Sequence, residues 1–354
     1  MKYPTWDDIQ ANFLFNGNPE MIAPEIPTFM GVPHAKSAAD LQGADVVIIG
    51  STYAATKTEL YCGVPRGEWM AAAKRVRQQS ARYLSGYIVD FDIDIFETLK
   101  VVDFGDADLP PEVMKTQAPD AVLQAQAAVE LKVGMALDAG AIPIVIGQNS
   151  PCASYAIAKP IAERIAGQVG CISLDTHWDI FKNDPTGGDP RIAGGANWKR
   201  KMYEFLPNMS RSNLVEIGER GMLEDKHSVR DFLQAGAKFI SAWDLRTRTG
   251  IDGTVKALDQ AYRDTDGVYV HFDMDVIGGA GPSGGDILGE LGEPLGLTDY
   301  EIIRIAHEIG LRGLSGMSFI AIPPGSPIMY RVIVYIITYL LAGLAIRKGA
   351  KPSC

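Results

Sequence analysis

Short, unbroken apolar segments recur along this chain, and they constrain its fold more than any other feature. The segments GADVVIIG (43–50) and AIPIVIG (141–147) are rich in β-branched residues and end in glycine. Such runs are typical of parallel strands buried on both faces, since a strand with one wet face would alternate apolar and polar residues. Similar runs lie at 101–106, 168–174, 213–217, 238–242, 267–272 and 314–322.

Helical signals fill most of the intervals between these runs. A helical stretch follows Pro65, another is expected around 153–166, and Thr298 with Glu301 forms a capping box before the last run. Helical spacing is clearest in one set that ends at a C-capping Gly140: Val122, Ala125, Val129, Val133 and Ala136. The alternation predicts an α/β protein, a single three-layer α/β/α domain with a mainly parallel sheet. We expect this domain over residues 46–354.

The first 45 residues form a Pro-rich N-terminal extension that precedes the alternation. It carries several large apolar residues that a loose tail would leave in water: Phe13, Leu14, Phe15, Ile26 and Phe29. Burying such a side chain is worth roughly 1.5–3 kcal/mol. The extension is therefore expected either to cover a subunit interface or to fold over its own domain.

Charge and cysteine usage narrow the class of protein. The net charge of −10 argues against a nucleic-acid backbone or an anionic membrane surface as partner, and permits a cationic small molecule or metal ions. Scattered cysteines without metal-binding spacing are typical of free thiols in a reducing compartment; they are Cys62, Cys152, Cys171 and Cys354. The N-terminus lacks a secretory pattern, and the apolar stretch 333–345 is shorter than a membrane span, which favours a buried core helix. A cytoplasmic location is predicted.

Two acidic motifs follow predicted strands. Asp175, His177 and Asp179 come directly after the run at 168–174, and Asp273 and Asp275 follow the run at 267–272. Residues two apart in an extended chain point the same way. Ligands bind beyond the carboxyl ends of strands in such sheets, so these groups are expected to face one crevice. Four carboxylates and an imidazole would repel one another without bound cations, and this donor set suits Mn(II) or Ni(II).

Each motif also has an ordinary interpretation. Asp or Asn after a strand often serves only as a helix cap or turn residue, and a D-x-H-x-D triplet occurs by chance. It is the combination of both motifs, each after a buried strand, that favours a metal site. Among the other histidines, His271 is expected to face the core at a strand end, with a supporting role beside the ligands as the alternative. His227 and His307 are expected to be surface or satisfied helix residues.

With these motifs in place, the chain resembles the ureohydrolase family of arginases and agmatinases, in the family's segment order from about residue 43 to 345. SLDTHWD (173–179) resembles the family's D-A-H-x-D signature, and HFDMD (271–275) its S-x-D-x-D signature. Four further segments resemble those of the family: VVDFGD (101–106), VEIGERG (215–221), EPLGLT (293–298) and IAIPP (320–324).

The chain departs from the family pattern at functional positions. The family's G-G-D-H-S segment, whose His binds one metal, aligns with residues 147–151, and its His falls on Ser150. The Glu with which the family holds the guanidinium group falls on Ala321, and the Asp-Pro pair after the second Asp motif is replaced at 278–279. These losses favour an impaired site over a mere change of substrate.

The resemblance implies roles for the remaining residues. One divalent ion would keep a full set of ligands: Asp175, His177, Asp273 and Asp275. The other ion would rely on Asp175, Asp179, Asp273 and whatever Ser150 or Asn149 offers, and a neutral hydroxyl or amide is a weaker ligand than imidazole. We therefore expect Ni or Mn at incomplete occupancy, or no bound metal. Asp179 and Asp275 would be catalytic if the chain is active.

Two functions follow from the resemblance. The favoured one resembles the degenerate subunit of enzymes of the metformin hydrolase type, which use nickel, hydrolyse metformin to guanylurea and dimethylamine, and pair a complete ureohydrolase chain with an impaired one. The chain would then be a pseudoenzyme in a hetero-oligomer, of the trimer or hexamer type, with a complete paralogue. The alternative is a stand-alone agmatinase or guanidine hydrolase with an altered metal site.

Overall fold

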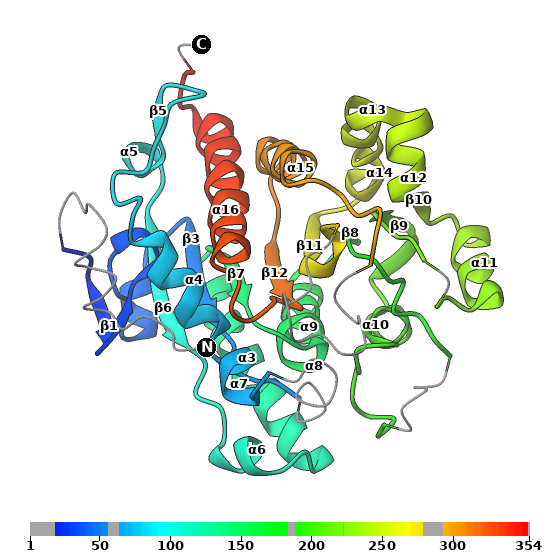
Figure 1. The fold of residues 1–354 in the computed structure, drawn as a ribbon, viewed down its shortest axis with the longest axis horizontal. Helices are drawn as coiled ribbons and strands as arrows, with labels where there is room; N and C mark the ends of the chain where they lie inside the picture. The colour runs from blue at the N-terminus through cyan, green and yellow to red at the C-terminus, as the bar shows by residue number, and fades with distance from the viewer. Residues whose placement is uncertain (1–17, 56–63, 183–187, 222, 279–292, 353–354) are drawn as a thin grey trace.

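A parallel sheet runs through the centre of the computed structural model, which describes residues 18–55, 64–182, 188–221, 223–278 and 293–352 (Figure 1). Within these residues the sheet has eight strands, in the order β10-β9-β8-β11-β12-β7-β3-β6. Their bounds are β3 (Val46–Gly50), β6 (Val101–Asp106), β7 (Ile142–Ile146), β8 (Val169–Leu174), β9 (Met209–Ile217), β10 (Lys238–Ile240), β11 (Gly267–Asp273) and β12 (Gly316–Ile320). Each strand overlaps one predicted apolar run, and all pairings are parallel.

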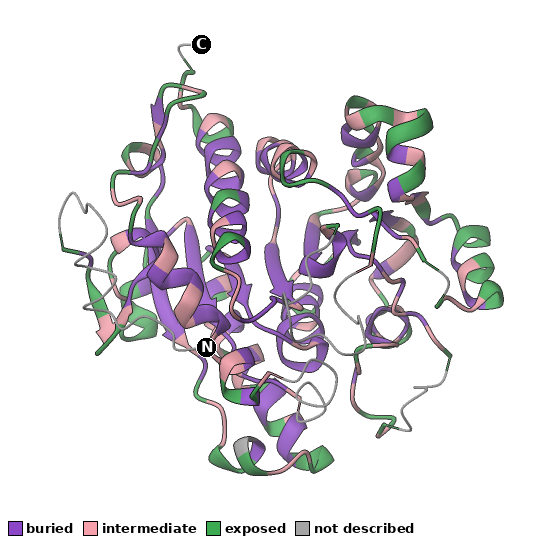
Figure 2. Cartoon of the chain, viewed as in Figure 1, coloured by how far each residue is buried: buried purple, intermediate pink, exposed green. Residues whose placement is uncertain are grey.

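Helices cover both faces of this sheet and make the three layers predicted from the sequence. On one face they are α4 (Ala72–Ser80), α14 (Asp259–Tyr262), α15 (Asp299–Arg312) and α16 (Pro327–Lys348). On the other face they are α7 (Pro119–Asp138), α8 (Ser150–Ala153), α9 (Tyr155–Arg164), α10 (Trp198–Phe205) and α11 (Lys226–Gln234). Two buried cores result, because alternate residues of one strand face opposite layers. Figure 2 shows the central strands as buried. Val46 and Ile48, for example, belong to the first core, and Val47 and Ile49 to the second.

Shorter elements complete the described chain. Two small antiparallel pairs lie outside the main sheet, β1 (Met21–Ala23) with β2 (Ile26–Pro27) and β4 (Tyr87–Ile88) with β5 (Ile93–Asp94). The remaining helices are α3 (Arg66–Met70), α5 (Ile95–Thr98), α6 (Pro111–Lys115), α12 (Ala242–Asp244) and α13 (Gly250–Ala257). Short 3-10 turns η1 (Phe29–Gly31), η2 (Ala38–Leu41) and η4 (Met274–Val276) and one π-helical turn η3 (Leu245–Thr249) also occur.

Several local predictions can be compared directly with the structure. The capping box at Thr298 and Glu301 is present at the start of α15, and Gly140 adopts a positive φ of 78° just after α7. His227 is exposed on α11, as expected. The expectation for His307 was wrong: it is buried on α15, stacks on Phe91 at 4.5 Å between ring centroids, and its Nε2 has no hydrogen-bond partner among the described residues.

The C-terminal helix α16 is long and apolar enough to cross a membrane by length and composition. In the structure, however, 78% of its most apolar 18-residue window is buried, and it packs against α15 and α4. It is therefore placed as a core helix, as the sequence predicted. The cytoplasmic location itself stays a prediction.

Part of the N-terminal extension packs on the domain that follows it. Phe29 is fully buried in the first core, and its backbone N–H donates to Asp103 Oδ2 on β6 at 2.8 Å. Ile26 is half-buried. Phe29 therefore packs on its own domain, which is one of the two arrangements expected for the extension. Phe13, Leu14 and Phe15 lie outside the described residues, and the proposed boundary at residue 45 stays a prediction.

Candidate functional site

The two acidic motifs meet because the strands that precede them are neighbours. In the β8–β11 ladder Leu174 pairs with Phe272, so Asp175 and Asp273 follow at adjacent carboxyl ends of the sheet. Asp175 is fully buried and Asp273 and Asp275 are nearly so. A parallel register thus brings together residues that are about 100 positions apart in the sequence.

The first group of possible ligands comprises Asp175, His177 and Asp275, whose ligating atoms all lie within 4.8 Å of one another. His177 Nδ1 is 3.1 Å from Asp275 Oδ2, and the His177 backbone N–H donates to Asp175 Oδ1 at 2.8 Å. Thr176 holds Asp275 in place, since its Oγ1 donates to the Asp275 carbonyl at 2.8 Å. Contacts within the chain alone therefore hold this group together.

The charges in this group act strongly on one another. Burial disfavours the His177 imidazolium, but the hydrogen bond to Asp275 and the nearby carboxylates outweigh it and raise the pKa of His177 to about 10. Burial would also raise the pKa of Asp275, yet the His177 contact lowers it to about 2. Without a metal, the protonated imidazole itself neutralises part of the carboxylate charge.

A second group comprises Asp175, His271 and Asp273, again with ligating atoms within 4.8 Å of one another. His271 lies on β11 and is fully buried, as the core interpretation predicted. Its Nδ1 is 3.3 Å from Ser318 Oγ, whereas its Nε2 has no hydrogen-bond partner among the described residues and lies 3.8 Å from Asp175 Oδ2. The imidazole thus sits beside the acidic motifs with one ring nitrogen free of hydrogen bonds to the described chain.

A lysine enters this cluster from helix α10. The Lys199 ammonium is fully buried, and its Nζ lies 3.2 Å from Asp175 Oδ2 and 2.9 Å from Glu216 Oε1 on β9. It also donates to Ser173 Oγ and to the His177 carbonyl, each at 3.1 Å. Burial alone would lower the pKa of Lys199, but Asp175 and Glu216 raise it well above its ordinary value. The ammonium therefore stays charged at neutral pH.

The carboxylates around Lys199 outnumber it. Burial raises the pKa of Asp175 to about 6, against the lowering effect of Lys199, and raises the pKa of Glu216 to about 8. Glu216 Oε2 and Glu219 Oε1 are buried without a hydrogen-bond partner in the described chain. The site is thus rich in acceptors and short of positive charge, which favours binding of a further cation.

Asp179 lies beside this cluster, close enough to help raise the pKa of His177. Its Oδ2 accepts a hydrogen bond from Trp198 Nε1 at 2.9 Å, and its backbone has a positive φ of 50°. It belongs to neither group of possible ligands found among the described residues. The structure therefore brings Asp175, His177, Asp273 and Asp275 together and leaves Asp179 beside them, and its metal and catalytic roles stay predictions.

The positions that depart from the family pattern lie at the ends of β7 and β12. Ser150 begins α8 and is buried, with its Oγ unpartnered in the described chain. Gln148 instead joins the two segments, because its Nε2 donates to the Ile322 carbonyl at 2.9 Å and its Oε1 accepts from Ile322 N at 2.8 Å. Ala321, with a positive φ of 51°, offers only a methyl group where the family has a carboxylate.

Sequence reasoning missed two members of the site. Glu216 had a usable signal, a single acidic residue inside an otherwise apolar run. Lys199 had none, because in WKRKMYEF three basic residues on a helix are typical of a solvated face. Only the register of the sheet places them: Ser173 pairs with Glu216 on one side and with His271 on the other, and Lys199 reaches over this row from α10.

A comparison with known proteins decides the family. The model of the arginase family matches residues 44–327. This chain belongs to the arginase family. A guanidinobutyrase from Pseudomonas aeruginosa is 26% identical over 304 residues, 83% of this chain and 82% of that protein, and a formimidoylglutamase from Halobacterium salinarum is 29% identical over 187 residues, 51% and 53% of the two chains.

Solved structures share the arginase-family fold. Proclavaminate amidino hydrolase from Streptomyces clavuligerus superposes with a TM-score of 0.71 at 22% identity, over 92% of this chain and all of that one. Formiminoglutamase from Trypanosoma cruzi, solved with Mn2+2, has a TM-score of 0.69 at 22% identity, over 91% and 99%. At these identities the likeness establishes the fold, and the site has to be judged from its own residues.

The residues present fit one divalent ion of the arginase-family kind. Two carboxylates and an imidazole converge in the Asp175, His177 and Asp275 group, with Asp273 adjacent, and oxygen and nitrogen donors of this kind suit Mn(II) or Ni(II). The family's second set does not fit in the same way, since the imidazole position is Ser150 and Asp179 is bonded to Trp198. Of the two ligand sets that the family resemblance implies, one therefore has its imidazole and the other does not.

Proposed function

We propose that this chain is the catalytically impaired subunit of a metal-dependent C–N hydrolase acting on guanidine or biguanide compounds. Its partner is a complete arginase-family paralogue in a mixed oligomer of trimeric or hexameric type. The favoured substrate of the complex is metformin, hydrolysed to guanylurea and dimethylamine. Family membership supports the hydrolytic chemistry, and the altered site supports the impaired role.

The observation that carries this proposal is the donor set. One ion is provided for, whereas Ser150 supplies a hydroxyl in place of the second imidazole. Ala321 removes the carboxylate that would anchor a cationic guanidinium group. Hydrolysis of this kind depends on divalent ions to lower the pKa of water and to polarise the substrate. Loss of one donor and of the substrate anchor affects two separate requirements of the same reaction.

The residues of the Asp175, His177 and Asp275 group hold one another in fixed positions. Asp275 accepts from His177 and holds its imidazole in a fixed orientation, and Thr176 fixes Asp275. Asp175 is held by the His177 backbone and by Lys199. These contacts position the metal ligands. Position 321 is an alanine, however, and supplies no carboxylate to hold a substrate. The site is thus organised for a structural or weakly active ion.

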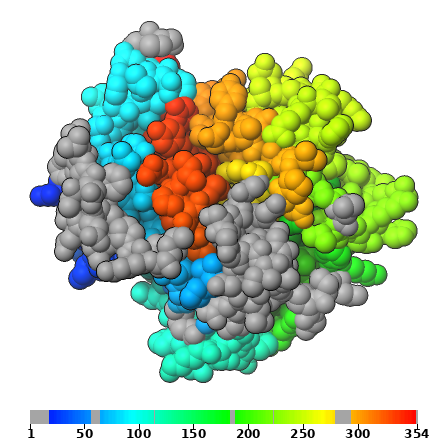
Figure 3. Space-filling model, in the orientation of Figure 1, coloured from blue at the N-terminus to red at the C-terminus, as the bar shows by residue number. Residues whose placement is uncertain are grey.

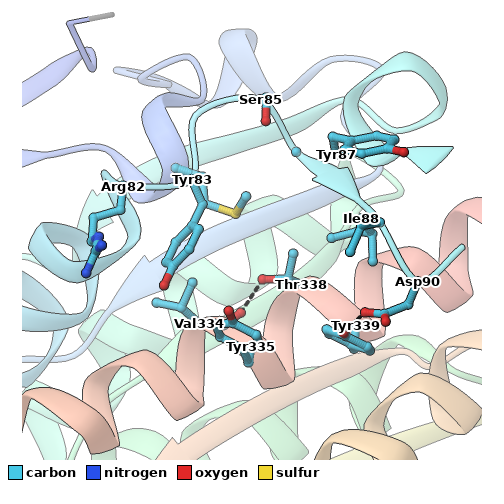
Figure 4. A pocket seen from close by; sticks show the side chains of 13 residues that line it. Arg82, Tyr83, Ser85, Tyr87, Ile88, Asp90, Val334, Tyr335, Thr338 and Tyr339 are labelled. Atoms are coloured by element: carbon cyan, nitrogen blue, oxygen red, sulfur yellow. Dashed lines mark hydrogen bonds between the residues drawn. The ribbon is translucent and has the colours of Figure 1, made fainter. Parts of the chain in front are cut away.

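An aromatic surface supports the partner half of the proposal. A cavity of about 270 Å³ lies between α16 and the 82–90 segment, lined by Tyr83, Tyr335 and Tyr339, and Asp90 accepts from Tyr339 at its rim (Figure 4). In the space-filling view α16 reaches the surface here, between the cyan segment and the orange α15 (Figure 3). Large side chains around it are exposed: Tyr87, Val89, Tyr300 and Tyr335. Exposed apolar patches of this kind mark protein interfaces.

The test is turnover by a mixed complex. Co-expression with a paralogue that carries an intact G-G-D-H-S segment should yield a soluble mixed oligomer, and the purified chain alone should show no release of dimethylamine from metformin. Complexes in which only this chain carries Asp175→Ala or Asp275→Ala should keep most of the wild-type turnover. As a matched control, the corresponding Asp→Ala change in the paralogue alone should abolish it.

The alternative, a stand-alone guanidine-type hydrolase, predicts the opposite pattern. The isolated chain would then release urea from agmatine or 4-guanidinobutyrate, and Asp275→Ala would abolish that release. Collapse of the mixed complex's activity on Asp275→Ala in this chain, with assembly intact by gel filtration, would assign the chemistry to this chain.

A further inference from the structure

A row of buried polar side chains crosses the sheet one layer beneath the acidic motifs. Glu216 on β9, Ser173 on β8, His271 on β11 and Ser318 on β12 are adjacent in register, and all four are fully buried. Polar groups at such depth are costly unless they are paired. Lys199 lies over this row, and its ammonium donates to Glu216 Oε1 at 2.9 Å.

The Lys199 ammonium has the environment of a bound cation. Its four contacts are all oxygens at 2.9 to 3.2 Å, from Ser173, Asp175, His177 and Glu216. Its three hydrogens are thus matched by at least as many acceptors. A compact point charge on a flexible stem is well suited to this position, because it needs no fixed fork geometry.

The same ammonium touches the carboxylate oxygen that the second ligand group needs. Asp175 Oδ2 is 3.2 Å from Lys199 Nζ and 3.8 Å from His271 Nε2. A divalent ion held by Asp175, His271 and Asp273 would therefore lie within a few ångströms of a buried positive charge. At that separation in a protein interior, poorly screened by water, the two positive charges repel each other strongly.

We propose that the Lys199 ammonium, held by four oxygens beneath the acidic motifs, takes the place of a second divalent ion, so that this chain holds one ion and its second group of ligands stays without metal. The inference rests on the proposed function for its premise that an arginase-family metal centre is retained. It goes beyond that function because it assigns Lys199 a role, and because it makes His271 a latent ligand that Lys199 blocks.

The experiment counts Mn²⁺ per chain, by elemental analysis after saturation with MnCl₂ and gel filtration. Wild type should retain one Mn²⁺. Lys199→Met should retain two, since the Asp175, His271 and Asp273 group loses its ammonium. The double variant with His271→Ala should return to one. The matched control is Lys201→Met on the same helix, because the Lys201 ammonium donates to the carbonyls of Pro190 and Ile192, and it should retain one.

Lys199→Gln, which keeps a neutral donor of similar length, replaces the methionine variant if that variant does not fold. Two Mn²⁺ in wild type would overturn the inference while leaving the proposed metal centre intact. One Mn²⁺ in a folded Lys199→Met or Lys199→Gln variant, judged by its near-ultraviolet circular dichroism, would overturn it as well. No Mn²⁺ in wild type would instead overturn the proposed function, and the inference with it.

Discussion

Buried cations lie on both faces of the sheet, Arg77 on α4 and Lys199 on α10, and their surroundings differ in one respect. Arg77 is matched to its acceptors: its Nε and Nη2 donate to the two oxygens of Asp103 at 2.8 and 2.9 Å, and its Nη1 to Asp106. The same Asp103 oxygens also accept from the backbone of Phe29 and Gly105. Around Lys199, by contrast, Glu216 Oε2 and Glu219 Oε1 have no partner in the described chain.

The difference teaches how a structural ion pair is told apart from a site. In the Arg77 region every carboxylate oxygen of Asp103 is satisfied, so nothing more can bind without breaking a hydrogen bond. The region ties α4, β6 and the segment around Phe29 together. In the Lys199 region acceptors exceed donors, which is unfavourable for a purely structural core but suits the surroundings of the one ion expected at Asp175, His177 and Asp275.

The largest expected effect comes from removing the Arg77 guanidinium from its contacts with Asp103 and Asp106. Arg77→Leu leaves Asp103 buried without its cation and should lower the free energy of unfolding by about 3–5 kcal/mol. Added Mn²⁺ should not recover this loss, because Asp103 and Asp106 belong to neither group of possible metal ligands among the described residues. Urea unfolding with and without MnCl₂ measures both quantities. Recovery by Mn²⁺ would mean that the Arg77 region also binds metal and that the contrast between the two regions is false.

The sequence predicted the sheet far better than it predicted this contrast. All eight strands of the sheet were expected, because a continuous apolar run such as that of β7 is a local signal that needs no partner. Asp175 and Asp273 were expected to meet for the same reason, since each directly follows such a run. The start of β9 was not predicted, because the strand begins at Met209, several residues before its apolar part.

Lys199 could not be placed from the sequence, because its role depends on the register of the sheet and on which face of α10 is buried. A lysine on a helix is ordinarily solvated, and only its depth distinguishes Lys199 from its neighbour Lys201. The hydrogen bond from Trp198 Nε1 to Asp179 Oδ2 likewise joins residues that no local pattern pairs. Local patterns thus predict elements and their ends, whereas charge balance inside the site depends on tertiary packing.

The second prediction concerns pH. Burial raises the pKa of Glu216 from its ordinary 4.5 to about 8. A group whose folded-state pKa is raised contributes stability that is fully present below its unfolded pKa and is lost as pH rises through the folded value. Metal-free wild type should therefore lose stability between pH 5 and 8.5, by on the order of 2 kcal/mol. Glu216→Gln should reduce that slope, while His177 and Asp175, whose pKa values are also raised, keep contributing to it.

The measurement is urea unfolding in EDTA at pH 5.5, 7 and 8.5. The exposed Glu112→Gln is the matched control and should keep the wild-type slope. The Arg77 region should add nothing over this range, because Arg77 keeps its charge: its acidic partners outweigh burial and raise its pKa further. A Glu216→Gln variant with an unchanged slope would indicate that Glu216 ionises normally and that the Lys199 region is not short of positive charge.

The smallest expected effect compares two serines, one in each region. Ser80 Oγ accepts from the buried Met30 N–H at 2.8 Å, and Ser80→Ala leaves that donor unpaired at a cost of about 1–3 kcal/mol. Ser173 Oγ accepts from Lys199, which retains three other acceptors for its three hydrogens when Ser173 becomes alanine. Ser173→Ala should therefore cost less than Ser80→Ala, about 0.5 kcal/mol or below. Urea unfolding of both variants in EDTA measures the two losses. The smaller loss is expected for Ser173→Ala because Lys199 has more acceptors than it needs. Equal losses would therefore mean that the acceptors around Lys199 are no more plentiful than those around Arg77.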